Sequence, residues 1–206
     1  DEGYDCVLIT GRLVERNKKL NKSVPVERII IYNRSSTIKR LFTWIMGFIQ
    51  IWIKVAFRYR NDSLFIVSNP PIAPLLRMVV KNRFNLLIFD VYPDAFSELG
   101  YLDKNSFILK LWEKANREVY SKAVNIFTIT EGMKLAIQKY VADKKIVVVP
   151  LWTDNTLLKP VDPSINPFLR KYNLSGKFFV LYSGNLGLSG DVDILVDVAA
   201  RIDRDD

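Results

Sequence analysis

Three polar loops hold the side chains best suited to bind a ligand. The first, Ser68-Asn69-Pro70-Pro71, follows an apolar run at 64–67. Its prolines fix an extended turn that leaves Ser68 and Asn69 to face a crevice, although a turn of this kind often only reverses the chain. In open α/β sheets ligands bind beyond the carboxyl ends of the strands, which is where this loop is expected.

The second loop is Asp90-Val91-Tyr92-Pro93-Asp94, after the apolar run NLLIF. Because Asp90 ends a strongly apolar strand, its carboxylate is either held by backbone amides of the loop or available to a hydroxyl group of a substrate. Asp94 is also a candidate N-cap of the next helix. Both interpretations stay open for each of the two carboxylates.

The third loop, at 183–190, reads SGNLGLSG. Its glycines let the backbone approach an anion closely, and the N-terminus of a following helix favours negative charge there. The loop matches neither the Walker pattern nor the G-x-G-x-x-G fingerprint. Asp191 and Asp193 follow it, and we interpret them as complements of the helix dipole rather than as metal ligands. We expect no metal.

Composition excludes several kinds of site. The chain has 206 residues, of which 49% are apolar and 12% aromatic, and this predicts a folded protein. It has no histidine and one cysteine, Cys6. Histidine-based zinc sites, histidine-based catalytic triads and disulfide frameworks are therefore excluded within this sequence. No signal-peptide pattern is found, and we expect a cytoplasmic protein.

The positive charge is concentrated in the first part of the chain. The net charge is +8, and residues 1–90 hold 15 Lys and Arg against 7 Asp and Glu, whereas residues 91–206 hold 15 of each. Such asymmetry suggests a polyanionic partner, either nucleic acid or an anionic membrane surface. A merely solvated basic face explains it equally well. No recognised nucleic-acid module is found, and we expect no nucleic acid to bind.

The elements that would position these loops alternate between strands and helices. Helices are predicted after Ser106 and after Thr130, which are suitable N-caps. The alternation predicts an α/β fold with a parallel sheet and flanking helices. Strands are predicted at 4–9, 28–32, 64–68, 85–90, 124–129, 145–150 and 178–183.

The stretch 41–57 is apolar and has basic residues on both sides. On a helix of about 100° per residue, its non-apolar residues form one narrow stripe. The stripe consists of Lys39, Thr43, Gly47, Gln50, Lys54 and Arg58. Three interpretations remain: a bilayer span, for which the stretch is short; a helix packed between the sheet and another element; and a helix that offers Trp44 and Trp52 to a lipid interface.

Read in order, these segments resemble bacterial glycosyltransferases of family 4, the retaining GT-B enzymes that build capsule, O-antigen and exopolysaccharide repeats. The resemblance runs from about residue 68 to the end of the chain. It is carried by DVYPDAFSELGYL at 90–102, ITEGMKLAI at 129–137, VVVPLWTDNTLLKP at 147–160, and NPFLRKYNLSGKFFVLYSGNLG at 166–187.

The resemblance implies two Rossmann-like domains that face a cleft. It implies a nucleotide-sugar donor, UDP-linked, a hexosyl or N-acetylhexosaminyl group to be transferred, and no metal or other cofactor. The acceptor would be a polyprenyl-diphosphate-linked sugar at the inner face of the plasma membrane, where the protein would be peripheral.

By position, the resemblance also assigns roles to residues. The acceptor side of the cleft would comprise Ser68, Asn69, Asp90, Tyr92, Asp94 and Glu131. The donor diphosphate would meet Gly184, Asn185 and Gly187, and the interdomain region would hold Trp152 and Asp154. Outside the resemblance, the apolar stretch with its basic flanks would be a membrane helix that presents Trp44, Trp52, Lys54 and Arg58.

We expect an N-terminal acceptor-side domain at 1–150 that lacks its first strand, a linker at 151–177, and the start of a donor-binding domain at 178–206. A chain of this kind would itself be inactive. Two alternatives stay open: a non-catalytic membrane-associated scaffold or binding module of polysaccharide assembly, and a sugar-nucleotide 2-epimerase with the GT-B architecture.

Overall fold

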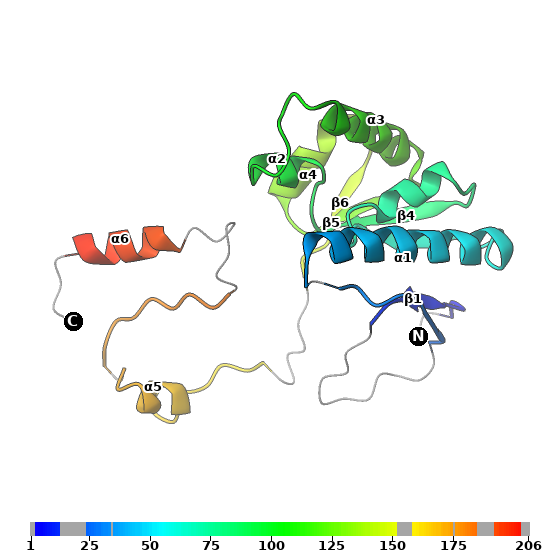
Figure 1. Cartoon of the computed structure of the whole chain (residues 1–206). Helices are drawn as coiled ribbons and strands as arrows, with labels where there is room; N and C mark the ends of the chain where they lie inside the picture. Colours follow the sequence, from blue (N-terminus) through cyan, green and yellow to red (C-terminus); the bar gives the residue numbers. More distant parts are fainter. Residues whose placement is uncertain are drawn as a thin grey trace. The chain divides into compact units, whose positions relative to one another are not determined.

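The computed structural model describes residues 3–12, 24–33, 35–151, 158–174, 176–184 and 192–202. The chain divides into two compact units, Asp1–Pro150 and Leu151–Asp206, which we call unit 1 and unit 2. Figure 1 follows the chain through both units. Their predicted roles as acceptor-side and donor-side domains stay predictions.

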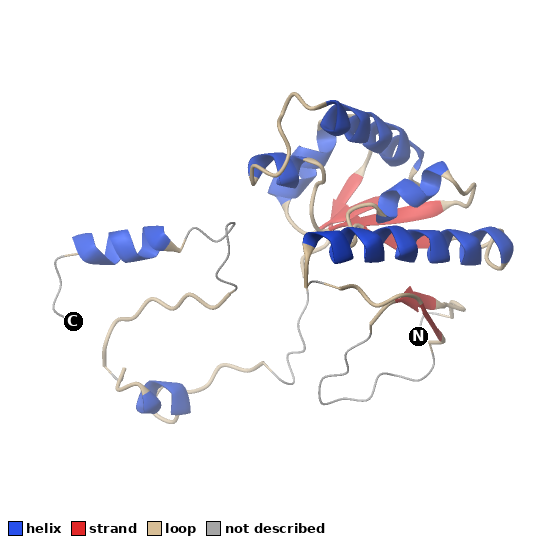
Figure 2. Ribbon diagram, in the orientation of Figure 1, coloured by secondary structure: helices blue, strands red, loops and turns tan. Residues whose placement is uncertain are grey.

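The centre of unit 1 is a four-stranded parallel sheet in the order β3-β4-β5-β6 (Figure 2). One row of paired residues, Ile66, Leu86, Ile126 and Ile146, runs across all four strands and is buried. This apolar row fixes the register, because a slip by one residue would turn every side chain to the other face. The strands are β3 (Leu64–Val67), β4 (Phe84–Ile88), β5 (Ile126–Thr128) and β6 (Ile146–Val148).

Helices pack on this sheet and complete the core. Val55, Leu76, Val119 and Ile137 come from four different helices and join one buried cluster with the strand residues. The predicted α/β fold with parallel strands and flanking helices is confirmed, and it is consistent with a Rossmann-like fold. The helices of unit 1 are α1 (Thr37–Phe57), the 3₁₀ helix η1 (Ala73–Met78), α2 (Asp94–Glu98), α3 (Phe107–Lys122) and α4 (Glu131–Gln138).

Both predicted N-caps are confirmed. Ser106 Oγ accepts a hydrogen bond from the backbone N–H of Leu109 at 3.2 Å, and α3 begins at the next residue. Thr130 Oγ1 does the same for Met133 at 3.2 Å at the start of α4. Each cap satisfies a backbone donor that the helix itself leaves unpaired.

The first two strands form a separate sheet, which the sequence did not predict. The strands β1 (Leu8–Thr10) and β2 (Val26–Arg28) pair in parallel with each other. The strand predicted at 28–32 overlaps β2 only at Arg28, since β2 begins at Val26 and ends at Arg28. Beyond it, the backbone N–H of Ile30 donates to Gln50 Oε1 of α1 at 2.7 Å. The N–H of Ile29 donates to the carbonyl of Thr10 in β1, so the N–H of Ile30 points to the other edge of β2, where a side chain of α1 pairs with it.

Unit 2 contains α5 (Pro167–Lys171) and α6 (Asp193–Arg201). The prediction of a strand at 178–183 is wrong, since the structure has no strand there. A strand needs a neighbour to pair its backbone groups, and the described residues of unit 2 include no other strand. The prediction that a second Rossmann-like domain begins at 178, and that the whole has GT-B architecture, stays untested.

Candidate functional site

The parallel strands β3 to β6 bring their carboxyl ends to one edge of the sheet, where ligands bind in open α/β folds. Ser68 follows β3, Asp90 follows β4 by two residues, and Glu131 follows β5 by three. The predicted acceptor-side residues are therefore placed along one edge. Their side chains, however, have different surroundings.

Ser68 positions the neighbouring loop. Its side chain is buried, and its Oγ accepts hydrogen bonds from the backbone N–H groups of Phe89 at 2.9 Å and of Asp90 at 3.5 Å. The hydroxyl therefore joins the end of β3 to the end of β4. Asn69, the next residue, is exposed. Contact of either side chain with a ligand stays a prediction.

Asp90 is exposed, and its carboxylate accepts no backbone amide hydrogen bond among the described residues. It lies beside the phenol of Tyr92. Burial, followed by the charge of Asp90 and a hydrogen bond to it, raises the pKa of Tyr92. Tyr92 therefore stays a neutral donor, and the Asp90 carboxylate faces solvent with capacity to accept further hydrogen bonds.

The loop after β4 is anchored from α3. Asn116 is 2% exposed, and its Nδ2 donates to the carbonyl oxygen of Tyr92 at 2.5 Å. The anchor lies 24 residues away in sequence. Because the donor is buried and comes from a rigid helix, it holds the backbone between Asp90 and Asp94 in one place.

An aromatic cluster that the sequence analysis missed surrounds Tyr92. The Tyr92 ring lies 4.7 Å from that of Phe96 and 6.5 Å from that of Trp112, between ring centroids. Tyr101 meets Phe96 edge to face at 6.3 Å. The spacing of four residues between Tyr92 and Phe96 could have predicted their contact from the sequence. Trp112 lies on α3, and only the folded structure shows that it reaches the cluster. The cluster therefore places aromatic rings around Tyr92, which itself lies beside the Asp90 carboxylate.

Asp94 links α2 to the end of α4. Its Oδ2 accepts a hydrogen bond from Tyr140 OH at 2.6 Å, and its Oδ1 pairs with Lys139 Nζ. Burial, together with this hydrogen bond, raises the pKa of Tyr140 far above its ordinary range. Asp94 is the first residue of α2 and not its cap, which is Pro93. These contacts make it a structural link.

Glu131 lies in the first turn of α4 and pairs with Lys134 Nζ at 3.0 Å. Glu131 is exposed and Lys134 is partly exposed, and an ion pair in such a position contributes little to stability. Its carboxylate also complements the positive end of the helix dipole. A contact of Glu131 with an acceptor stays a prediction.

The polar stripe of α1 is turned inward, toward β2 and the residues that follow it. Lys54 Nζ pairs with Glu27 Oε2 at 2.6 Å, and Arg58 pairs with the other oxygen of Glu27 at 2.9 Å. Hydrogen bonds from Lys54 and from Tyr59, helped by the charge of Arg58, lower the pKa of the Glu27 carboxyl. Thr43 Oγ1 accepts the backbone N–H of Asn33 at 3.3 Å.

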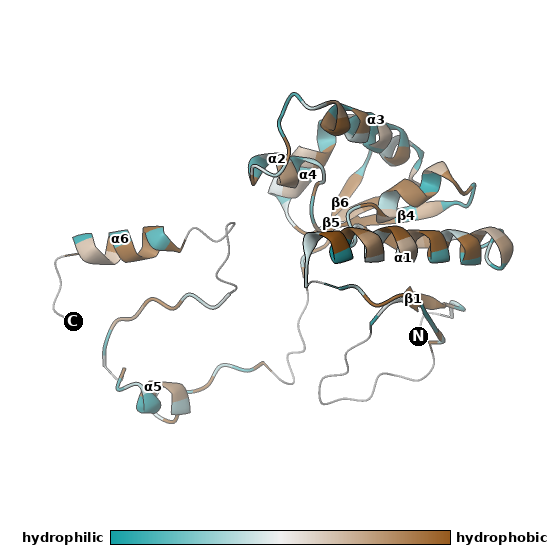
Figure 3. Cartoon of the chain, viewed as in Figure 1, coloured by the Kyte–Doolittle hydropathy of each residue, from teal (hydrophilic) through white to brown (hydrophobic). Residues whose placement is uncertain are grey.

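The opposite side of α1 is exposed and apolar (Figure 3). A third side, with Phe48, Ile51 and Val55, packs on the core. Helix α1 is thus packed on the core, as one of the interpretations predicted, and its remaining apolar face is covered by none of the described residues. By length and composition alone, α1 is also long enough to span a bilayer. The exposed face comprises Ile38, Leu41, Phe42, Ile45, Trp52, Ile53 and Phe57.

The two tryptophans predicted to meet lipid differ in exposure. Trp52 is exposed, whereas Trp44 is half-buried and stacks on Tyr32 with 5.8 Å between ring centroids. Lys54 is also half-buried because it is paired with Glu27. Of the four predicted membrane residues, Trp52 and Arg58 are therefore the exposed ones.

Several predicted residues lie outside the described part of the chain, namely Trp152, Asp154, Asn185 and Gly187. Gly184 is described, and a Cβ placed there would lie 2.9 Å from the hydroxyl of Tyr182. Within the described residues no group of three or more Asp, Glu, Cys or His could hold a metal ion. The expected absence of metal stays a prediction.

No protein-family model matches the chain. The chain is 26% identical, over 170 residues, to the probable glycosyltransferase WbjE of Pseudomonas aeruginosa. The match covers 79% of this chain and 42% of that relative. The chain therefore spans less than half the length of the curated relative that it matches.

Proposed function

We propose that the chain is part of a glycosyltransferase. The observation that carries this proposal is the similarity to WbjE along 79% of the chain. The α/β fold with parallel strands is compatible with it, but a fold of this kind hosts many activities. The specific argument therefore rests on the relative and on the loop after β4.

In this proposal unit 1 binds the acceptor. The exposed Asp90 carboxylate accepts hydrogen bonds from sugar hydroxyls, and the aromatic cluster around Tyr92 offers ring faces to the C–H side of a sugar ring. Ser68 and Asn116 hold the loop from two sides. The site is thereby organised before a ligand arrives, which reduces the entropy lost on binding.

The proposed reaction is retaining transfer of a sugar from a nucleotide-sugar, UDP-linked, to a lipid-linked or glycan acceptor in cell-surface polysaccharide synthesis. Unit 2 would contribute donor contacts through Gly184, Asn185 and Gly187. The enzyme has GT-B architecture in this proposal and uses no metal. Fixed backbone dipoles stabilise the departing diphosphate.

A membrane surface fits the exposed face of α1. The face is apolar, and Lys39 and Arg40 at its start and Arg58 and Arg60 after its end are exposed. Apolar residues flanked by cations suit a helix that lies in the interface of an anionic leaflet. The helix does not span in this proposal, because its polar stripe is bound to β2 and the segment after it. The acceptor would be a polyprenyl-diphosphate-linked sugar.

The test is a calorimetric titration of the chain with a farnesyl-diphosphate-linked N-acetylglucosamine. We expect binding that Asp90→Asn weakens about ten-fold, since a hydrogen bond to a charged group is lost. The matched control is Asp143→Asn, which removes an exposed carboxylate of the same unit and leaves binding unchanged. Equal affinity for farnesyl diphosphate without sugar, or no effect of Asp90→Asn, would contradict the acceptor role of this loop.

A further inference from the structure

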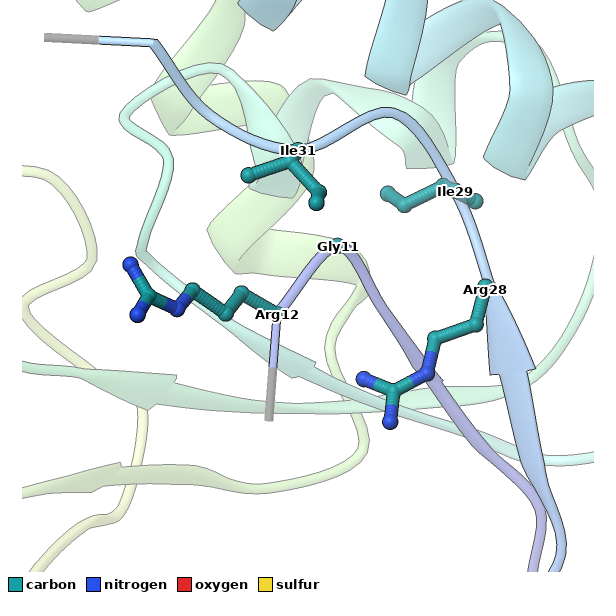
Figure 4. A pocket seen from close by; sticks show the side chains of 5 residues that line it. All are labelled: Gly11, Arg12, Arg28, Ile29 and Ile31. Atoms are coloured by element: carbon teal, nitrogen blue, oxygen red, sulfur yellow. The ribbon is translucent and has the colours of Figure 1, made fainter. Parts of the chain in front are cut away.

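A hollow of about 390 Å³ opens at the carboxyl ends of β1 and β2 (Figure 4). Two arginines line it, and their side chains are exposed. None of its lining residues is acidic. The hollow is separate from the loop after β4, yet it occupies the equivalent position of its own sheet, where parallel strands end. Its lining consists of Gly11, Arg12, Arg28, Ile29 and Ile31.

The backbone fixes the points from which the two arginines leave the sheet. Thr10 pairs with Arg28 in the ladder, and the N–H of Ile29 donates to the carbonyl of Thr10 at 3.2 Å. A Cβ at Gly11 would lie 2.6 Å from the carbonyl oxygen of Ile30. The backbone segments that continue β1 and β2 therefore remain in close contact up to Gly11, the residue before Arg12. Glycine allows this approach because it has no side chain.

Among the described residues, no carboxylate pairs with the two arginines at the hollow. Side chains alternate along a strand, and because Glu27 points to α1, Arg28 points to the other face. The Glu27 carboxylate forms ion pairs with Lys54 and Arg58. Within the described residues, neither Arg12 nor Arg28 has an ion-pair or hydrogen-bond partner for its guanidinium group. Both side chains carry a positive charge at the hollow, and an anion bound there would offset the repulsion between them.

We propose that this hollow binds a phosphate or diphosphate group through Arg12 and Arg28. The planar guanidinium group presents paired N–H donors that match two oxygens of a phosphate, and two such groups suit a doubly charged anion. The close approach at Gly11 fixes the spacing of the two strand ends that carry the arginines, whose side chains leave in different directions and turn toward each other to share an anion (Figure 4). The inference rests on β1 and β2 alone and does not depend on sugar transfer.

The test is a titration of the chain with inorganic pyrophosphate, followed by calorimetry and by the amide NMR signal of Gly11. We expect saturable binding that the double variant Arg12→Gln/Arg28→Gln weakens by about ten-fold or more. The matched control is Lys81→Gln/Arg83→Gln, which removes the same charge from exposed positions of unit 1. Circular dichroism checks that each variant keeps its fold.

Binding that is lost in the first double variant and kept in the control supports the site. Absence of saturable binding by the unmodified chain, or equal loss in both double variants, overturns it, because the effect would then be one of net charge. Sedimentation with vesicles that contain phosphatidylglycerol identifies the source of the phosphate. Lost vesicle binding in Arg12→Gln/Arg28→Gln assigns the site to lipid headgroups, and unchanged vesicle binding assigns it to a soluble or glycan-linked diphosphate.

Discussion

Replacing Asn116 by alanine tests how the loop of the candidate site is held. The substitution removes the donor to the carbonyl of the half-buried Tyr92, and this carbonyl is then left without its partner. An unsatisfied buried polar group costs about 1–3 kcal/mol, and the small cavity adds to this. We expect the free energy of unfolding to fall by about 2–3 kcal/mol, which corresponds to roughly 5–10 °C in Tm for a domain of this size.

Urea unfolding followed by tryptophan fluorescence measures this loss, and Trp112 lies within the affected aromatic cluster. Lys114→Ala is the matched control on the same helix, since Lys114 is exposed, and it should change stability by less than about 0.5 kcal/mol. A loss of under about 0.5 kcal/mol for Asn116→Ala would refute the reasoning. The Tyr92 carbonyl would then have another partner, such as water, in solution.

Three further predictions concern other parts of unit 1. Because the pKa of Glu27 is lowered in the folded chain, its stabilising effect is full above the ordinary value of 4.5 and is lost as the pH falls through the lower folded value. Urea midpoints over that acid range should therefore depend less on pH in Glu27→Gln than in the parent, while Glu98→Gln, an exposed control, should leave the slope unchanged. Gly11→Ala places a Cβ 2.6 Å from the carbonyl oxygen of Ile30, and we expect a loss of about 1–3 kcal/mol in the same unfolding assay; an unchanged midpoint would show that β1 ends differently. Ser68→Ala removes a buried hydroxyl and leaves the N–H of Phe89 without its acceptor, and we expect it to cost about 1–3 kcal/mol and to speed hydrogen exchange at that amide; unaltered exchange would contradict the link between β3 and β4.

Elements set by local interactions could be predicted from the sequence. The caps Ser106 and Thr130 act within three residues, and both helices begin where expected. The prediction of a strand at 178–183 failed because a strand depends on a non-local partner. Its apolar, β-branched residues satisfy the local pattern, but a strand exists only with a paired neighbour, and sequence periodicity contains no information about that partner.

The candidate site shows the same division. Asp90 and Tyr92 were predicted because loops after parallel strands meet at one edge of the sheet. The anchor Asn116 and the ring of Trp112 come from a helix far along the chain, and nothing in their local sequence indicates this contact. The polar stripe of α1 was also predicted, whereas its inward direction depends on Glu27, which lies 27 residues before Lys54.

That unit 1 meets its acceptor at a membrane surface is tested most directly by sedimentation of the chain with liposomes, with and without anionic lipid. The test variant removes three exposed apolar side chains of α1. The matched control removes three exposed apolar side chains from α3 and α4. The substitutions are Phe42→Ser, Trp52→Ser and Phe57→Ser in the test variant, and Phe107→Ser, Leu111→Ser and Leu135→Ser in the control.

We predict that the parent binds anionic liposomes, that salt weakens this binding, and that the test variant binds at least about ten-fold more weakly while the control does not. Circular dichroism must first show that both variants are folded. If the parent stays in the supernatant at low salt with anionic lipid, or if both variants lose binding equally, the exposed face of α1 is not a membrane contact and the lipid-linked acceptor loses its support.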